Sequence, residues 1–507
     1  MAAGDIQERV DSEAVRQLSP AMSFINGKDR DAVDGSRMQT VSPIDGRTLT
    51  DFPDSGVADV DAAVAAARRA FRDRRWCGLG RRERKKVLLR FADLIAQHQF
   101  ELGVLQSRDM GMPVAMAINM DAGEAANTIR WYGEALDKLS DELLALSDRD
   151  TGLVAKVPVG VVGAIVPWNF PLMITAWKLG PALAAGNSVV LKPAEDASLA
   201  LVRLAQIASE AGLPDGVFNV VTGRGEVAGK ALALHGDVDA ITFTGSGRVG
   251  GLVLQYAGQS NLKRVSLECG GKTANIVLAD APDLEEAAQH AARSIFRNQG
   301  QICNAPSRLL VESSIHDGFV DRVVEIASTL RTGSPLRLDS DLGPVVNSRQ
   351  LAGITVAIDK AARDGATLRL DGRSAERPSQ GCYLGPTIAT GVDPTSSLAQ
   401  EEVFGPVLAV MAIDSLDHGI EIANGTRYGL GAAVWTRDID KAMYASERLQ
   451  AGSVFVNAAG GVNIEMPFGG FKESGFGRDR SLHAFDKFTD TKATLIRRSA
   501  RDVGGRA

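Results

Sequence analysis

Residues 188–214, SVVLKPAEDASLALVRLAQIASEAGLP, contain the pattern that decides the fold. SVVLK predicts a short buried strand, and the residues after it carry apolar side chains at helical spacing. Ser198 directly precedes the apolar run and is expected to cap the helix, while Gly212 and Pro214 are typical of a helix end. A strand followed closely by a helix is the repeating unit of α/β domains.

The same unit recurs on both sides of this stretch. Further strands are predicted at 217–221, 239–244, 274–278 and 307–312, and helices at 81–98, 283–297 and 314–330. This alternation predicts a parallel, doubly wound sheet, and its resumption after about residue 280 implies a second α/β domain. Residues 153–157 (LVAKV) and 492–498 (KATLIRR) look like strands that belong to the strand–helix alternation of neither predicted domain. They are expected to pair with each other or with another subunit.

Composition limits the class of protein. A chain of 507 residues exceeds one compact core, so two or three domains are expected. A net charge of −6 gives no basic field for nucleic acid or for an anionic membrane. The four cysteines form no CxxC pair and the six histidines no HxxxH pattern, so neither a disulfide framework nor a metal site is predicted. A reducing cytoplasm is the expected compartment.

Neither the ends of the chain nor its one long uncharged stretch predicts a targeting signal or a membrane span. Residues 1–22 are polar and acidic and are expected to form a flexible leader, not a signal peptide; residues 501–507 are expected to form a loose tail. Residues 157–177 carry no charge but include several prolines. They are interpreted as a buried strand followed by a loop, not as a membrane span.

Cys303 is the first candidate for chemistry. It lies in FRNQGQICNAPSR (296–308), after a predicted helix and among Gly, Gln and Asn. A cysteine nucleophile needs a thiolate, an open approach and donors for a developing oxyanion, and polar amides with a tight glycine turn can supply the donors. The alternative is a buried structural cysteine, the commoner case for a lone cysteine in a large protein.

Two neighbouring motifs offer partners for such a nucleophile. Glu268 in LECGGK (267–272) is either a general base or an ordinary turn carboxylate. Cys269 beside it is a rival nucleophile, although packing is the expected role of a cysteine at a strand end. Asn169 in VPWNFP (166–171) lies between prolines and aromatic residues, where its amide donates either to an oxyanion or to local backbone.

Glycine-rich turns follow two of the predicted strands. FTGSGRVG (243–250) has the Gly-x-Gly-x-x-Gly spacing of a dinucleotide-binding turn, and TGRGEVAG (222–229) is a second candidate. Either turn can place a pyrophosphate at a helix N-terminus. The generic fingerprint would make Glu268 the acid that binds a ribose, which conflicts with a role as base.

Together these residues resemble the aldehyde dehydrogenase superfamily. The resemblance extends from about Phe24 to Leu495 and rests on PWNFP, LKPAE, FTGS, LECGG, QGQIC, EEVFGP and PFGGFKESG, in this order. Each motif is weak alone, but the ordered set at the family's spacing is specific. Further stretches look most like bacterial γ-glutamyl-γ-aminobutyraldehyde and ω-aminoaldehyde dehydrogenases of polyamine breakdown.

The resemblance implies catalytic roles for five residues. Cys303 matches the nucleophile that forms a thiohemiacetal and then a thioester, and Asn169 matches the side chain that holds the oxyanion together with the Cys303 backbone N–H. Glu268 matches the base that activates water, which replaces the ribose-binding role. Lys178 and Asp479 match positions implicated in proton relay, and relatives often carry Glu in place of Asp479.

The resemblance also implies an NAD site. Glu195 would lie beside the 2′-hydroxyl of the adenosine ribose and would repel a 2′-phosphate, so NAD is expected over NADP, which Lys192 would still tolerate. The expected cofactor-binding residues are Ile165, Pro167, Trp168, Lys192, Glu195, Gly225, Gly229, Phe243, Gly245, Ser246, Val249, Glu402 and Phe404.

The implied fold is α/β, with a Rossmann-like coenzyme domain, a second α/β catalytic domain and an oligomerisation arm of two β-strands. The expected boundaries are 23–140 and 161–271 for the NAD-binding domain, 272–475 for the catalytic domain, and 141–160 with 487–500 for the arm. In the family such an arm bridges subunits, so a homodimer or homotetramer is expected.

A few side chains narrow the substrate. Glu268 implies water as the acyl acceptor, since relatives that use coenzyme A generally lack it, and Trp177 stands where enzymes for succinate semialdehyde carry an arginine. A carboxylate in the tunnel would favour an aldehyde with a cationic tail, unless the two acids concerned form a solvated helix face. The expected tunnel residues are Asp121, Glu124, Phe170, Trp177 and Phe468.

The sequence therefore allows several alternative functions. The leading one is NAD-dependent oxidation of an ω-aminoaldehyde or of γ-glutamyl-γ-aminobutyraldehyde in polyamine catabolism, followed by broad oxidation of aliphatic or aromatic aldehydes. An esterase-like or acyl-transferring thiol enzyme would not need the cofactor motifs. A catalytically inactive structural or binding relative would not need Cys303, Glu268 and Asn169 together.

Overall fold

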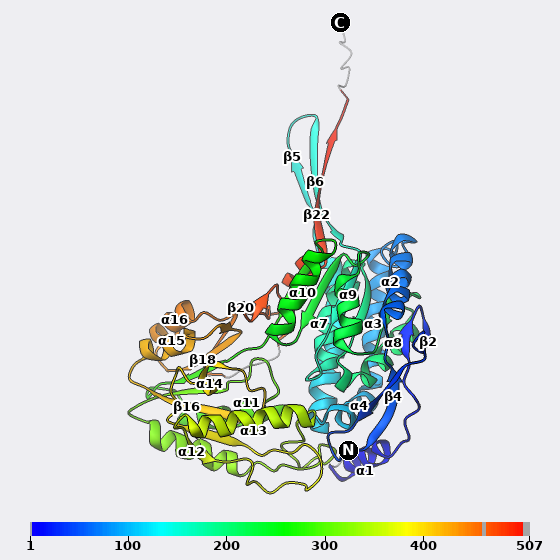
Figure 1. Cartoon of the computed structure of the whole chain (residues 1–507). Helices are drawn as coiled ribbons and strands as arrows, with labels where there is room; N and C mark the ends of the chain where they lie inside the picture. The colour runs from blue at the N-terminus through cyan, green and yellow to red at the C-terminus, as the bar shows by residue number, and fades with distance from the viewer. Residues whose placement is uncertain (1–2, 459–462, 500–507) are drawn as a thin grey trace.

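The computed structural model describes residues 3–458 and 463–499, and its first sheet has eight strands in the order β2-β1-β9-β8-β7-β10-β11-β21 (Figure 1). The quoted stretch supplies the central strand β8. The parallel strands are β9 (Phe218–Val220), β8 (Ser188–Lys192), β7 (Val161–Ile165), β10 (Ala240–Thr244) and β11 (Arg264–Glu268). The antiparallel edges are β1 (Ser23–Ile25), β2 (Lys28–Arg30) and β21 (Gly475–Phe476).

Helices cover both faces of this sheet, as a doubly wound fold requires. Their apolar side chains form two separate cores, one on each face. One face carries α3 (Arg81–Gln97), α6 (Gly123–Ala135), α7 (Pro171–Ala185) and α8 (Leu199–Glu210), and the other carries α2 (Val57–Arg72), α9 (Lys230–Leu234) and α10 (Gly247–Gln259). The α/β fold class predicted from the sequence is confirmed.

The second sheet has seven strands in the order β14-β15-β16-β13-β12-β18-β19, all parallel except the edge strand β14. Its strands are β12 (Ala274–Val277), β13 (Arg308–Glu312), β14 (Thr367–Leu370), β15 (Thr387–Thr390), β16 (Val407–Ile413), β18 (Gly431–Trp435) and β19 (Ser453–Val456). Helices α11 (Leu284–Phe296) and α12 (His316–Ser328) pack on one face, and α13 (Ser348–Arg363) and α15 (Leu416–Asn424) on the other. The exact domain boundaries stay a prediction.

Helix α7 was missed by the sequence analysis. The loop expected after strand β7 spans only residues 166–170, because the helix begins at Pro171. Fourteen of its fifteen residues are buried, so the helix is buried on every side; apart from Thr175 and Lys178 it is apolar, and it shows no helical periodicity. Across residues 3–458 and 463–499, no helix is both long and apolar enough to cross a membrane.

The expected cap of helix α8 is also wrong. Ser198 donates its hydroxyl hydrogen to the carbonyl of Ala194, 2.9 Å away, and does not cap the helix. The backbone N–H of Leu199 instead donates to Oδ2 of Asp109 at 3.2 Å, from helix α4 (Gln99–Met110). The cap therefore comes from a residue 90 positions away, which no local pattern reveals.

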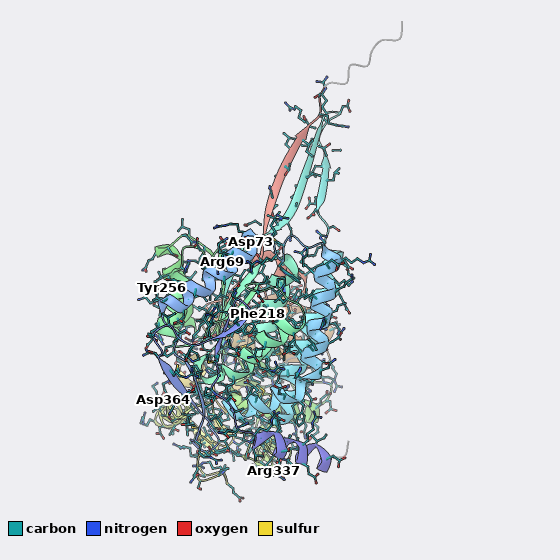
Figure 2. All side chains as sticks on the ribbon, turned by 90° about the vertical axis from the view of Figure 1, so that its right-hand side faces the viewer. Arg69, Asp73, Phe218, Tyr256, Arg337 and Asp364 are labelled. Atoms are coloured by element: carbon teal, nitrogen blue, oxygen red, sulfur yellow. The ribbon has the colours of Figure 1, made fainter. Side chains whose placement is uncertain are left out.

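The sequence analysis predicts a flexible leader over residues 1–22, but part of this segment forms helix α1 (Ala3–Ala14). Val10 is fully buried against Val104 and Val114. The Gln7 side chain donates to the carbonyl of Leu336 at 3.0 Å and accepts from the N–H of Leu338 at 2.9 Å. Figure 2 labels Arg337, between these two partners, beside the helix. The tail expected at 501–507 lies outside the described residues.

A slender arm projects from the body of the molecule (Figures 1 and 2). Strand β6 (Asp150–Pro158) pairs with β22 (Thr489–Arg497) over their full length, in antiparallel register. The two sequence stretches that fitted neither rhythm thus pair with each other. A third strand, β5 (Glu142–Ala145), joins them, so the arm has three strands and not the expected two.

Candidate active site

Two cavities, of about 340 and 310 Å³, meet at Cys303. Asn169, Ile174 and Cys303 line both of them. The first, called here the tail cavity, is bordered by α7 and by residues 302–306. The second, called the cofactor cavity, is bordered by the ends of β10 and β11 and by residues 402–404. Two spaces that reach one sulfur atom can bring two reactants to it in a fixed orientation.

The turn before Cys303 is strained. Asn298, Gln299 and Gly300 have φ values of 46°, 57° and 72°, in the left-handed region that non-glycine residues seldom adopt. A side chain at Gly300 would overlap the backbone of Gly405, so glycine is required there. The Asn298 amide donates to the carbonyl of Asn169 at 3.0 Å and ties the turn to the oxyanion motif.

The two glycines of LECGGK serve close packing around the same site. A Cβ atom at Gly270 would overlap the carboxylate of Glu402, and one at Gly271 would lie 2.6 Å from the carbonyl oxygen of Cys303. The N–H of Gly271 donates to Oε1 of Glu402 at 3.1 Å. The motif thus lets the nucleophile loop and the 402–404 loop lie directly against the end of strand β11.

Burial shapes the electrostatics of the nucleophile and the base. It raises the pKa of Cys303 to about 12, with further contributions from Glu402 and Glu268, so the free thiol holds its proton at neutral pH. Glu268 is 3% exposed, and neither carboxylate oxygen has a hydrogen-bond partner among the described residues. Burial, followed by the charge of Asp479, raises the pKa of Glu268 well above its usual value. A carboxylate with a raised pKa is a suitable proton acceptor near neutrality.

Asn169 is placed to stabilise an oxyanion. It is 2% exposed and lines both cavities beside Cys303. Its amide nitrogen donates to the carbonyl of Gln301 at 2.9 Å, which fixes the orientation of the side chain. A buried amide held in this way is preorganised for charge that develops next to the sulfur.

Behind Glu268 lies a buried ionic cluster. Lys178 from helix α7 contacts Oδ2 of Asp479, and Lys487 contacts Oδ1 of the same carboxylate. All three side chains are nearly inaccessible to solvent. Although burial raises the pKa of Asp479, the two lysines lower it below the usual value. Lys178 and Asp479 were singled out in the sequence, whereas Lys487 was not.

The cofactor cavity brings together one end of the expected NAD-binding set. The ring of Trp168 packs edge-on against the ring of Phe404, with centroids 5.3 Å apart, and Phe404 has a φ of 54°. Glu402 lies in the same wall, and burial raises its pKa to about 7. Pro167, Gly245 and Ser246 complete this wall.

The remainder of the expected set lies along β7, β8 and the turn after β9. Lys192 forms an ion pair with Glu195 at 3.3 Å, and Glu195 accepts a hydrogen bond from the N–H of Gly225 at 2.5 Å. Gly229 approaches Ile165 and Lys192, so a side chain there would fill the groove between them.

A helix N-terminus lies between these two parts of the groove. Ser246 caps helix α10 by accepting from the N–H of Val249 at 3.4 Å, and Phe243 packs under Gly245. Backbone N–H groups at such a terminus, with a Lys–Glu pair on one side and an aromatic wall on the other, fit a dinucleotide.

Aromatic side chains form part of the lining of the tail cavity. Phe170, Trp177 and Phe468 border it, and the rings of Trp177 and Phe468 lie 5.3 Å apart. Asp121 does not line it: this buried side chain accepts from the N–H groups of Leu172 and Met173 and caps helix α7. The expectation of a tunnel carboxylate at Asp121 is therefore wrong.

The expected place of Glu124 at the tunnel mouth stays a prediction. Glu124 is partly exposed, accepts a hydrogen bond from Asn127 on its own helix and does not border the cavity. The charged side chains that do line the tail cavity, within the described residues, are Arg297 and Arg480. Neither was singled out in the sequence.

Arg480 is a buried cation without an ionic partner. It is 4% exposed, and its guanidinium lies over the rings of Trp177 and Phe468 at 5.4 and 5.1 Å. No hydrogen bond or ion pair joins this guanidinium to another described residue, and its Nε–H is buried without an acceptor. Its φ of 59° shows that the backbone is held in a strained conformation that turns the side chain towards the cavity.

The sequence profile of the aldehyde dehydrogenase family matches residues 30–494, almost the whole chain. The chain belongs to this family. It is therefore an oxidoreductase that acts on aldehydes, and the resemblance seen in the sequence is confirmed. Among the residues that the structure describes, no cluster of His, Cys, Asp or Glu could hold a metal ion.

Individual aldehyde dehydrogenases are similar over nearly their full length. The NADP/NAD-dependent aldehyde dehydrogenase PuuC of Escherichia coli is 47% identical, over 93% of this chain and 95% of its own. The crystal structure of a γ-glutamyl-γ-aminobutyraldehyde dehydrogenase from Burkholderia cenocepacia is 49% identical, with a TM-score of 0.94, and the match covers 98% of this chain and all of that one. An indole-3-acetaldehyde dehydrogenase solved with NAD⁺ is 47% identical, with the same TM-score and coverage.

The residues that the sequence analysis missed in this aldehyde dehydrogenase share one property. Arg480 and Lys487 are charged side chains in a segment rich in other charged residues, GRDRSLHAFDKFTD (477–490). Charged residues are usually exposed, so this composition indicates a surface loop. Ala484 and Phe485, within the LHAF stretch of this segment, are fully buried. These apolar residues were the available sequence signal that the segment packs into the interior.

Proposed function

We propose that this aldehyde dehydrogenase oxidises γ-glutamyl-γ-aminobutyraldehyde to the acid, using NAD. The observation that carries this choice is the charge of the tail cavity, which has two arginines and no carboxylate among its described lining residues. In this aldehyde the nitrogen next to the reacting chain belongs to an amide and carries no charge, and the far end bears a carboxylate beside an α-ammonium group, so that end has no net charge. A guanidinium binds a carboxylate well and repels an ammonium group.

The relatives support the proposal. The Burkholderia structure is that of an enzyme for this aldehyde, and it matches the chain at 49% identity. A free ω-aminoaldehyde would place its ammonium in a cavity already occupied by Arg480, and burial makes that repulsion strong. The proposal therefore keeps the expected role in polyamine catabolism but favours the γ-glutamyl compound over the free ω-aminoaldehyde as substrate.

In the proposed mechanism, the Cys303 thiol releases its proton to solvent and its sulfur bonds to the aldehyde carbon, while the carbonyl π pair moves to the oxygen of the thiohemiacetal, to which the Asn169 amide donates. When bound, NAD supplies the electron acceptor that turns this adduct into a thioester. Glu268 then takes a proton from water, and the hydroxide oxygen bonds to the thioester carbon. The carbon–sulfur bond breaks, the acid leaves, and Glu268 gives the proton that it took from water to the Cys303 thiolate.

We further propose how the chain holds its cofactor and assembles. Lys192 and Glu195 would hold the adenosine ribose, with Glu402 and Phe404 beside the nicotinamide. Although burial raises the pKa of Glu195, Lys192 lowers it below the usual value, so the side chain is a carboxylate that disfavours the 2′-phosphate of NADP. The arm would join subunits into a homodimer or homotetramer, since its strand β22 is exposed along most of its length. The cytoplasm is the proposed compartment.

The test is NAD reduction by the purified protein with γ-glutamyl-γ-aminobutyraldehyde, 4-aminobutanal and pentanal. We expect kcat/KM to be highest for the γ-glutamyl compound, and higher for pentanal than for 4-aminobutanal. A preference for 4-aminobutanal would contradict the proposal, because it would require a carboxylate in the cavity.

A second candidate substrate is an arylacetaldehyde. The neighbouring rings of Trp177 and Phe468, tilted by 49° to each other, border the tail cavity and suit an aromatic tail, and an indole-3-acetaldehyde dehydrogenase matches the chain at 47% identity. Indole-3-acetaldehyde should therefore be included in the assay. A kcat/KM above that of the γ-glutamyl compound would make it the preferred substrate.

A further inference from the structure

Asp479 is held by two buried lysines, where one would suffice to neutralise it. Lys178 comes from helix α7, and Lys487 comes from the last turn of a short 3-10 helix (Leu482–Lys487). Each ammonium contacts a different oxygen of the carboxylate. The three charges alone sum to +1, and a buried excess charge is costly unless another group balances it.

Glu268 is the group that can balance this charge. It is buried, and both its oxygens lack hydrogen-bond partners within the described residues. The charges of Lys178, Lys487 and Arg478 favour its ionised form, whereas burial and Asp479 oppose it. Cys303, Cys269 and Arg480 also interact with it electrostatically. With Glu268 ionised, the two lysines and two carboxylates sum to zero.

We propose that Lys487 is a positioning residue for thioester hydrolysis. Its charge compensates the carboxylate of Glu268 and so sets the pH range in which that base can accept a proton from water. With Lys178 alone, Asp479 would already be neutralised, and an ionised Glu268 would be left with only the charges of Arg478 and Arg480 to balance it. The inference rests on the proposed role of Glu268 as base.

The competing explanation is that Lys487 only holds Asp479 in place. Both roles predict a loss of stability when the lysine is removed, because a buried partner is lost. The explanations differ in the pH dependence. A purely structural lysine leaves the ionisation of Glu268 unchanged, whereas a compensating one shifts it.

The experiment compares K487M and K487R with the wild-type enzyme. Steady-state NADH production and the NADH burst of the first turnover are measured from pH 5 to pH 10. Removing a nearby positive charge disfavours the Glu268 carboxylate, so in K487M we expect the acidic limb of steady-state turnover to rise by about one pH unit. Turnover near pH 7 should fall roughly tenfold and recover at higher pH, while K487R keeps the wild-type limb.

Lys263 provides a matched control. It is a buried lysine at the opposite end of strand β11 from Glu268, and it donates to the carbonyl of Ala233 at 2.8 Å and to Ser260 at 2.6 Å. K263M should lower stability without moving the pH limb. A wild-type limb in folded K487M would overturn the inference.

Two further variants distinguish a failure of the proposed role of Glu268 from a failure of the proposed role of Lys487. E268Q that still hydrolyses the thioester would reject the proposed base itself; E268Q blocked at the thioester, with an unshifted K487M, would reject only the role of Lys487. If K487M does not fold, K487Q decides, because it removes the same positive charge and keeps a hydrogen-bond donor for Asp479. An unshifted limb in folded K487Q would overturn the inference.

Discussion

The cofactor cavity and the tail cavity share Cys303, Asn169 and Ile174, but they are built from different structure. The cofactor cavity is formed by strand ends, glycine turns and a helix N-terminus, so its geometry is largely that of the backbone. The tail cavity is formed by large side chains of helix α7 and of segments far away in the sequence, including Phe468 and Arg480. Backbone-built sites leave ordered motifs in a sequence, whereas side-chain-built sites leave scattered residues. Four substitutions would break or sharpen this comparison.

The largest effect is expected at the sulfur where the cavities meet. C303A removes the nucleophile and should lower NADH production by roughly 10³-fold or more, since no other group can form the thioester. NAD binding, followed by calorimetry, should persist because the cofactor cavity is intact. Turnover close to wild type in this variant would overturn the assignment of Cys303.

Asn169 also belongs to both cavities, and its loss should be the next largest. N169A removes an oxyanion donor, so we expect kcat to fall about 10² to 10³-fold. Pre-steady-state NADH formation is the appropriate measurement, because the oxyanion develops before the thioester forms. Normal burst kinetics would instead mean that Asn169 only anchors the Gln301 loop.

A smaller, substrate-dependent effect is expected in the tail cavity alone. R480M should lower kcat/KM for γ-glutamyl-γ-aminobutyraldehyde by roughly 10 to 100-fold through loss of a buried charged hydrogen bond. Activity with pentanal should change little, and activity with 4-aminobutanal should rise. R297M is the matched control, with a weaker effect because Arg297 is exposed and screened by solvent. Equal losses on all three aldehydes would assign Arg480 to packing.

The smallest effect is expected outside both cavities, at the Lys192–Glu195 ion pair of the expected NAD groove. E195Q removes the charge opposed to a 2′-phosphate, so the ratio of kcat/KM for NADP to that for NAD should rise about tenfold. The KM for the aldehyde should stay unchanged, since Glu195 does not border the tail cavity. A ratio equal to that of the wild type would indicate that other groups select the cofactor.

Much of the fold followed from the sequence because its signals are local. The β–α alternation predicted strands β8, β9, β10, β12 and β13 within one or two residues, and the two stretches outside that alternation, 153–157 and 492–498, identified the arm. Helix α7 escaped because an evenly apolar helix has no periodicity, and helix α1 because a polar, acidic segment does not show that it will dock on a distant loop.

For the site, the sequence by itself determined the family and the ordered motifs around Cys303, Glu268 and the glycine turns. Those motifs encode backbone geometry, and backbone geometry is set by neighbouring residues. Only the tertiary structure decided what the acidic and basic side chains do. In that structure Asp121 caps helix α7, and Arg480 and Lys487 are buried beside the active site. The reason is physical: the free energy of a buried charge depends on its partners, and here those partners lie up to hundreds of residues away in the chain.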